Sequence, residues 1–209
     1  VPEEKVAVVY NALPLSFTER EYDISKIHPK LSEPYFLYVG RLEPRKNIPN
    51  ILRAYKQFIA NRQIPPNLVL VGNKDNYYKT VNTQIDELGL VNKVILLDYV
   101  KQNQLYSIYK NALAFLFPSL YEGFGIPILE AFKAQAPVIT TNYGATAEIA
   151  DNAAILVDPT DSSDIANAMK AIFTNNEERS RLIQNGLTRL SDFNWDISAG
   201  KMINLWKNL

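Results

Sequence analysis

Leu113-Ala-Phe-Leu-Phe-Pro-Ser-Leu-Tyr-Glu-Gly-Phe-Gly-Ile-Pro-Ile-Leu-Glu130 is the stretch of sequence that decides the fold. Its first residues, 113–117, form an apolar run typical of a buried strand. An apolar helix with Pro127 near its first turn follows a turn that contains Gly123 and Gly125. A strand, a turn with free backbone N–H groups and a helix N-terminus together favour phosphate binding. The stretch therefore predicts an α/β fold with an anion site at this turn.

Two carboxylates, Glu122 and Glu130, lie eight residues apart and bracket the two glycines. A phosphate loop does not need carboxylates, but hydroxyl groups of a sugar or ribose do need acceptors. Taken singly, Glu122 is better interpreted as solvated, and Glu130 as an exposed carboxylate that favours the helix dipole. Their joint spacing around Gly-Phe-Gly favours a shared role in ligand binding.

Short β-branched and aromatic runs alternate with helical patterns on both sides of this stretch. We expect strands at 5–11, 35–40, 67–72, 94–99, 113–117, 137–141 and 153–157. We expect helices at 47–62, 77–88, 103–111, 127–135, 145–150, 161–173, 177–190 and 197–206, and a loop with one helical turn at 12–34. Near-continuous apolar strands that alternate with helices predict a Rossmann-like, doubly wound parallel sheet covered by helices on both faces.

The composition excludes several classes of protein. Lys plus Arg and Asp plus Glu both number 22 in 209 residues, so bulk electrostatics does not favour nucleic-acid binding. The absence of cysteine excludes disulfides and thiolate chemistry and is compatible with the cytosol. No apolar run approaches the ~20 residues of a transmembrane helix. Residues 1–5 contain neither an initiator Met nor a signal-peptide pattern, so we expect the chain to be part of a longer one.

A second loop, Gly40-Arg-Leu-Glu-Pro-Arg-Lys-Asn47, follows the strand expected at 35–40. In a doubly wound sheet, ligands bind at the carboxyl ends of the strands, where this loop and the glycine-rich turn are both expected. Arg41, Arg45 and Lys46 could neutralise a bound diphosphate there. Alone, these residues are better interpreted as a solvated basic loop. The glycine-rich turn expected along the same edge favours a binding role.

Gly40-Arg41 with Lys46-Asn47, and then Glu122-Gly-Phe-Gly-Ile-Pro-Ile-Leu-Glu130, resemble a known family. This family is the retaining family 4 glycosyltransferases (glycosyl transferases group 1) with the GT-B fold, and the match is to their C-terminal, donor-binding domain. Its Glu-x7-Glu motif is matched in full, and the segments 118–119, 137–140, 142–148 and 193–196 are also similar to the family. The resemblance implies a nucleotide-sugar-binding domain over 1–193. It also implies a C-terminal helix over 194–209 that crosses to an N-terminal domain absent from this chain.

The resemblance implies roles for particular positions. Arg41 and Lys46, after Gly40, would clamp the diphosphate of the donor, and Glu122 would lie near the sugar hydroxyls. The remaining donor contacts would be the backbone of Gly123, Phe124 and Gly125, the ribose-binding Glu130 and the base-binding segment around Val100. The chemistry agrees, because fixed cations and N–H dipoles stabilise the charge of a departing diphosphate.

Metal-binding residues are sparse. The chain has no Asp-x-Asp sequence and one histidine, His28, so we expect neither a Mg²⁺ nor a Zn²⁺ site and no further cofactor. His28 lies beside a proline in a loop, so we expect a surface residue and not the family's catalytic histidine, which belongs to the N-terminal domain. The segment 72–75 lacks a second glycine that the family often has, which leaves donor contacts there open.

Several functions stay open at this point. The resemblance implies transfer from GDP-mannose or a UDP-sugar, with mannose as the first expectation, to a glycan or glycolipid in polysaccharide synthesis. It implies a cytoplasmic enzyme, with the full-length protein at the inner face of a membrane, and little turnover by this domain alone. Alternatives are a hydrolysing nucleotide-sugar 2-epimerase, for which no second set of acid and base carboxylates is found, and a non-catalytic nucleotide-sugar-binding module. A nicotinamide enzyme is disfavoured, because no Gly-x-Gly-x-x-Gly follows a strand.

Overall fold

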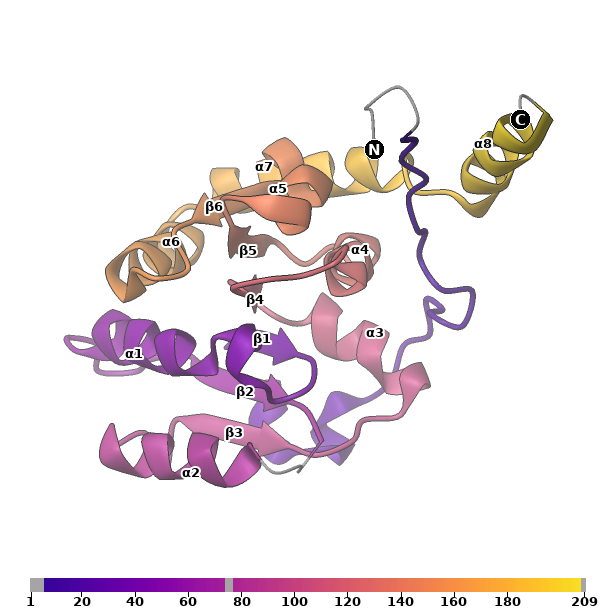
Figure 1. The fold of residues 1–209 in the computed structure, drawn as a ribbon. Coiled ribbons are helices and arrows are strands. Elements are labelled where there is room, and N and C mark those ends of the chain that lie inside the picture. The colour runs from indigo at the N-terminus through magenta and orange to yellow at the C-terminus, as the bar shows by residue number, and fades with distance from the viewer. Residues whose placement is uncertain (1–5, 74–76, 208–209) are drawn as a thin grey trace.

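One parallel β-sheet organises the part of the chain that the computed structural model describes, residues 6–73 and 77–207. Within those residues it has six strands in the order β3-β2-β1-β4-β5-β6, and every neighbouring pair is parallel (Figure 1). The strands are β1 (Tyr35–Val39), β2 (Asn67–Val71), β3 (Val94–Leu97), β4 (Ala114–Phe117), β5 (Val138–Thr141) and β6 (Ala154–Val157). The expected doubly wound fold is confirmed.

Helices cover both faces of this sheet, with α1, α2 and α6 on one face and α3 and α4 on the other (Figure 1). In addition, α1 packs against α2 and α6, whereas α4 packs against α3, α5 and α7. Their bounds are α1 (Ile48–Ile59), α2 (Tyr78–Glu87), α3 (Gln102–Lys110), α4 (Ile126–Lys133), α5 (Gly144–Ala150), α6 (Ser162–Thr174), α7 (Asn176–Leu190) and α8 (Trp195–Lys207). All eight expected helices are present, with ends that differ from the expectation by at most three residues.

The local sequence explains these elements. Strands β2 and β4 are buried along their whole length, as expected for strands with helices on both sides. Helix α1 buries Ile48, Ile51, Leu52 and Tyr55, a spacing that forms one apolar stripe against the sheet. Burial of these side chains stabilises the two helical layers by about 25 cal/mol for each Å² of apolar surface removed from water.

The central pair of strands, β1 and β4, is where the connection reverses direction across the sheet. From β1 the chain proceeds outward to β2 and β3, then returns through α3 to β4 and proceeds outward to β5 and β6. In sheets of this topology, the usual ligand site lies outside the carboxyl ends of the two strands where the connection reverses. This topology places the two motif-bearing loops at one edge.

The prediction of a strand at 5–11 is wrong for residues 6–11. Lys5 lies outside the residues that the structure describes. Residues 6–13 are extended but belong to no sheet. They lie beside α8, where Ser198 Oγ donates to the carbonyl of Tyr10 at 2.6 Å and Trp195 Nε1 donates to that of Leu13 at 3.0 Å. The apolar side chains of this segment are not buried in the sheet, and Val6 and Val8 are 61% and 62% exposed.

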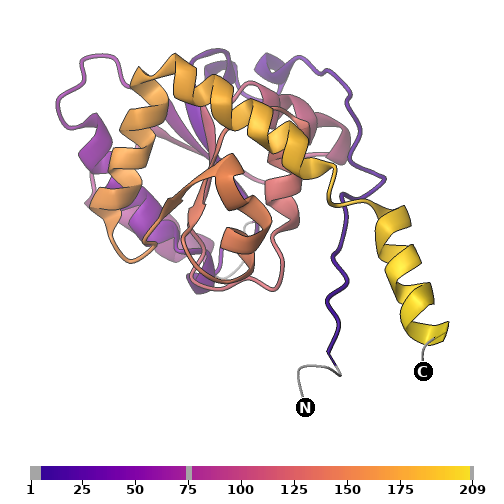
Figure 2. The ribbon, with the colours of Figure 1, turned by 90° about the horizontal axis from the view of Figure 1, so that it is seen from above.

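The C-terminal helix α8 extends away from the sheet beside the N-terminal segment, as Figures 1 and 2 show. Exposed apolar side chains of α8 are Trp195, Ile197, Met202, Ile203, Leu205 and Trp206. No helix among residues 6–73 and 77–207 is long and apolar enough to cross a membrane.

Residues 12–34 form a loop that contains two short 3₁₀ helices, η2 (Ile24–Lys26) and η3 (Pro29–Ser32), where we expected one helical turn. His28 is half-buried in this loop, and its Nδ1 accepts from the backbone N–H of Lys30 at 3.2 Å at the start of η3. The histidine therefore caps a helix.

Candidate functional site

The loop after β1 and the loop after β4 contact each other at the carboxyl edge of the sheet. The backbone N–H of Leu120 donates to the carbonyl of Arg45 at 2.8 Å. Asn47, which is left-handed and precedes α1, donates from its buried Nδ2 to the carbonyls of Pro118 at 3.0 Å and Pro159 at 2.6 Å. These bonds fix the loops after β1, β4 and β6 relative to one another. The expected meeting of the two motifs is thus present.

Lys46 and Glu122 form an ion pair where the two loops meet. Lys46 Nζ lies 2.5 Å from Glu122 Oε1, and the side chains are 9% and 10% exposed. Arg45 Nη1 donates to the other oxygen, Glu122 Oε2, at 2.9 Å, and the ammonium of Lys46 lies 4.7 Å from the centre of the Phe117 ring. The interpretation as solvated residues is wrong for Lys46 and Glu122, which are shielded from water, whereas the Arg45 side chain is 43% exposed.

Arg41 differs from Lys46 in its exposure. Its side chain is 71% exposed, and within the described part of the chain its guanidinium forms an ion pair with Glu43 at 3.2 Å. Glu43 also accepts from Arg45 Nε at 3.0 Å, so it links the two arginines. Exposed ion pairs of this kind contribute roughly 0–1 kcal/mol, so a stronger anion can replace Glu43 as the partner of Arg41.

The glycine-rich turn leads into α4 through Gly125, whose φ of +114° favours glycine. A Cβ on Gly125 would lie 3.2 Å from Ile128 Cδ1, whereas a Cβ on Gly123 would have no other atom within 4 Å. Between them, Phe124 packs its ring against Tyr10 at 6.2 Å and Phe193 at 5.8 Å. The fold therefore requires glycine at 125, while at 123 the backbone is open.

Glu130 lies within α4 and is half-buried, so its interpretation as an exposed carboxylate is wrong. Its Oε2 accepts a hydrogen bond from Tyr109 Oη, on α3, at 3.0 Å. Burial raises the pKa of the Glu130 carboxyl, and the hydrogen bond from Tyr109 opposes that rise by stabilising the ionised form. A partly desolvated carboxylate with one fixed partner suits the recognition of ligand hydroxyls.

Val100 is 7% exposed and lines a cavity of about 170 Å³ at the ends of β1, β2 and β3. Gly40, Arg41, Gly72, Asp98, Gln102 and Leu105 are among the other lining residues. Apolar walls with a few polar groups suit a planar ring. The structure describes Gly72 and Asn73, while Lys74 and Asp75 of the segment that lacks the second glycine lie outside the described residues.

Two features of the site were missed in the sequence. Tyr109 gave no signal, because it belongs to another helix and lies 21 residues before Glu130. Ser119 follows β4 and is 2% exposed, and among the described residues its Oγ has no hydrogen-bond partner. The positions of Tyr109 and Ser119 become visible only in the tertiary structure, where α3 and β4 pack around the turn.

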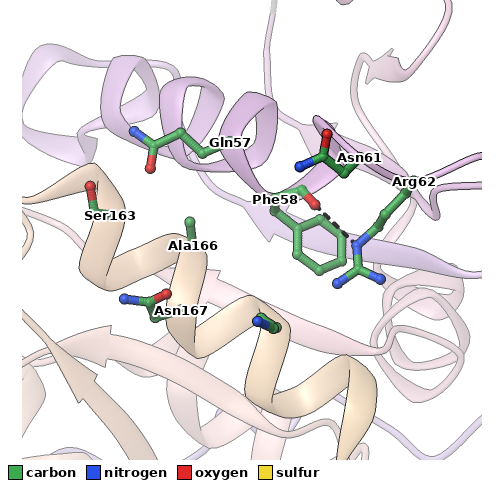
Figure 3. A pocket seen from close by; sticks show the side chains of 8 residues that line it. Gln57, Phe58, Asn61, Arg62, Ser163, Ala166 and Asn167 are labelled. Atoms are coloured by element: carbon green, nitrogen blue, oxygen red, sulfur yellow. Dashed lines mark hydrogen bonds between the residues drawn. The ribbon is translucent and has the colours of Figure 1, made fainter.

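The rest of the described surface carries no comparable arrangement. Among residues 6–73 and 77–207, no group of three or more His, Cys, Asp or Glu side chains could hold a metal ion. A groove of about 420 Å³ lies between α1 and α6, with Gln57, Phe58 and Asn167 in its lining (Figure 3). Arg62 Nε donates to the carbonyl of Phe58 there at 3.0 Å. No residue of the two motif-bearing loops lines this groove.

Comparison with known proteins places the chain in a family. The sequence profile described as glycosyl transferases group 1 matches residues 19–189. The chain is 33% identical over 176 residues to the O-antigen chain mannosyltransferase B of Escherichia coli, covering 84% of this chain and 46% of that protein. It is 34% identical over 175 residues to the O-antigen chain mannosyltransferase RfbU of Salmonella typhimurium, covering 82% and 45%. The chain thus spans about half the length of these curated relatives.

Solved structures with the same fold include the sucrose-phosphate synthase of Thermosynechococcus elongatus. It is 26% identical with a TM-score of 0.75, and the match covers 96% of this chain and 49% of that one. The HepE protein of Anabaena, in complex with UDP-glucose, gives a TM-score of 0.83 at 22% identity over 100% of this chain and 59% of that one, and shows the fold alone. With a Rossmann-like α/β domain of the GT-B type and a profile match over most of its length, this chain belongs to the glycosyl transferases group 1 family.

Proposed function

We propose that this chain is the donor-binding domain of a retaining glycosyltransferase that binds a nucleotide-diphospho-sugar without a metal ion. The observation that carries the proposal is the junction of the Lys46 loop with the glycine-rich turn, beside the switch point between β1 and β4. Positive side chains, open backbone N–H groups and half-buried carboxylates meet there, which is the set of groups that a sugar nucleotide requires.

The diphosphate would bind Arg41 and Lys46, together with the backbone of Gly123, Phe124 and Gly125. Arg41 is exposed and can turn toward a ligand, whereas Lys46 is fixed in place by Glu122. The N-terminus of α4 begins directly after Gly125 and adds the positive end of its dipole. This arrangement supplies positive charge without Mg²⁺.

The other parts of the donor would occupy the flanking positions. Glu122 would accept from hydroxyls of the sugar, and Glu130 from the two hydroxyls of the ribose. The cavity lined by Gly40 and Val100 would hold the base. The base cavity, Glu130 and the phosphate loops would then correspond to the base, the ribose and the diphosphate of the donor.

Transfer breaks the bond between the anomeric carbon and the diphosphate oxygen, and the bonding electrons leave with the diphosphate. A new bond joins the same carbon to the acceptor oxygen, whose proton is released. Arg41, Lys46 and the turn amides would stabilise the charge that develops on the diphosphate. Such preorganised groups are worth about 10²-fold in rate each.

For the donor sugar we propose a hexose carried by GDP or UDP, with mannose first. Two relatives above 30% identity are named as mannosyltransferases, whereas the UDP-glucose complex belongs to a protein of 22% identity. For the acceptor we propose a glycan or glycolipid bound by an N-terminal domain, in a cytoplasmic enzyme that associates with a membrane surface. Alone, this chain would bind the donor and turn over little, because the acceptor is not positioned.

Calorimetry in EDTA tests the proposal, with GDP, UDP, ADP and their sugars as ligands. We expect heat of binding with at least one nucleotide, unchanged when Mg²⁺ replaces EDTA. No heat with any of these ligands would overturn the proposal, and binding that needs Mg²⁺ would overturn its metal independence. A thermal-shift panel then identifies the donor, because the tightest ligand raises the unfolding temperature most.

A further inference from the structure

The contact between Tyr109 and Glu130 connects two helices that are separate in sequence, α3 and α4. Tyr109 Oη donates to Glu130 Oε2 at 3.0 Å. Among the described residues, this is the hydrogen bond that the Glu130 carboxylate accepts, and no other is found. One oxygen of the carboxylate is therefore held by the protein, and the other remains for a ligand.

Tyr109 is itself held rigidly. Its side chain is fully buried, and its ring makes edge-to-face contacts with Phe115 at 5.1 Å and Phe17 at 6.1 Å between centroids. Burial raises the pKa of the phenol well above its ordinary value, so the hydroxyl keeps its proton and acts as a donor. A rigid donor on Oε2 restricts the rotamers of the glutamate before the ligand binds, so less side-chain entropy is lost on binding.

Helix α3 also connects this contact to the base cavity. Leu105 lines the cavity, and Tyr109 lies four residues later, on the same face of the helix. Along α3, Tyr109 therefore lies about one helical turn from the residue that lines the cavity. In a nucleotide, the ribose lies next to the base.

We propose that Tyr109 is a positioning residue that orients the Glu130 carboxylate toward the ribose hydroxyls of the bound nucleotide. The inference rests on the proposed function of the site and adds a residue that acts through Glu130. It assigns to the buried hydroxyl of Tyr109 a role in ribose recognition as well as in packing.

The test compares nucleotides with and without the ribose hydroxyls. Calorimetry measures the affinity of the wild-type chain for GDP, UDP and ADP and for their 2′,3′-dideoxy forms, and the ratio of each pair is the ribose preference. Tyr109→Phe keeps the ring and its aromatic contacts. We expect it to lower the ribose preference about tenfold, because Glu130 loses the charge-assisted hydrogen bond that orients its carboxylate. The affinity for the dideoxy form should stay unchanged.

Tyr35→Phe is the matched control. Tyr35 is also fully buried, and its hydroxyl donates to the carbonyl of Ile108 on α3 at 2.7 Å, so the control removes the same group beside the same helix. We expect a similar fall in unfolding temperature for both variants and an unchanged ribose preference for Tyr35→Phe. A change in preference that accompanied both variants would assign the effect to stability alone and overturn the inference.

A double variant provides a second measurement. In a Glu130→Gln background, Tyr109→Phe should lower the ribose preference no further, because both substitutions act on one contact. Additive effects would overturn the inference, as would an unchanged ribose preference in Tyr109→Phe when the wild type has one. If the wild-type chain bound no nucleotide, the proposed function would fail and this inference with it.

Discussion

Lys46 Nζ lies 2.5 Å from Glu122 Oε1, and this pair joins the loop after β1 to the loop after β4 across 76 residues of sequence. The pair neutralises Lys46, the cation that we propose to contact the diphosphate. Because both side chains are nearly buried, their geometry is fixed before a ligand arrives. Desolvation offsets most of the stabilisation that such a pair provides, so we infer that its value lies in positioning.

The first prediction concerns Glu122→Gln. The amide keeps the shape and an acceptor for Lys46 but removes the charge that neutralises Lys46 and Arg45. We expect the affinity for a bare nucleoside diphosphate to rise several-fold. We expect the additional affinity contributed by the sugar to fall about tenfold, because one carboxylate acceptor is lost. Calorimetry with the nucleotide and its sugar measures both effects.

Glu178→Gln is the matched control for this variant. Glu178 also pairs with an arginine, Arg181, but both residues belong to α7 and not to the motif-bearing loops. It should change neither affinity. Glu130→Ala should weaken the binding of the free nucleotide, because it removes the proposed acceptor of the ribose hydroxyls. An equal loss of free-nucleotide binding in Glu122→Gln would contradict the proposed division between sugar and ribose.

The second prediction separates two glycines of the turn. Gly125→Ala requires an alanine at a φ of +114° with its Cβ 3.2 Å from Ile128 Cδ1, so we expect a loss of about 1–3 kcal/mol in the free energy of unfolding. Gly123→Ala meets no neighbouring atom, and we expect a change within about 0.5 kcal/mol. Urea titration measures both. Gly123→Ala should nevertheless weaken nucleotide-sugar binding, and full binding by this variant would show that the backbone at 123 does not approach the ligand.

The third prediction concerns pH and Glu130. Burial raises the pKa of this carboxyl in the folded chain, so the folded state holds the proton more tightly than the unfolded state does. The contribution of Glu130 to the free energy of unfolding therefore falls as pH rises from the unfolded pKa through the folded one. Glu130→Gln removes this dependence, and we expect its unfolding temperature to exceed that of the wild type more at pH 8 than at pH 4.

Nucleotide binding should show the opposite trend in the wild type, weakening as pH falls and Glu130 takes up its proton. Differential scanning fluorimetry and calorimetry across pH measure the two trends, with the exposed Glu87→Gln as the control. Parallel stability curves for the wild type and Glu130→Gln would refute the assignment.

The fourth prediction tests the boundary expected between residues 193 and 194. Ser198 is the buried residue of α8, whereas Phe193, just before it, is 4% exposed and packs on Tyr10 and Phe124. We expect a chain ending at Phe193 to unfold within about 2–4 °C of the full chain and to bind nucleotide equally well. Phe193→Ala should cost about 3–5 kcal/mol. A large loss of stability on truncation would make α8 part of the domain.

Local patterns predicted most elements of the fold. The apolar runs at 67–72 and 113–117 are buried strands because their side chains face helices on both sides. The exception is instructive, since residues 6–11 have the same composition as a strand but lie beside α8. An apolar run indicates that a segment can form a strand, and only the tertiary structure decides whether a sheet takes it up; Val6 and Val8 stay 61% and 62% exposed.

By itself, the sequence determined the alternation of strands and helices, the glycine-rich turn after a buried strand, and the Glu-x7-Glu spacing. These are local properties, fixed by side-chain periodicity and by backbone freedom at Gly125. The tertiary structure alone decided that Lys46 pairs with Glu122 and that Tyr109 holds Glu130. Those contacts join residues that are distant along the chain, and they exist because the order of the strands brings β1 beside β4 and α3 beside α4.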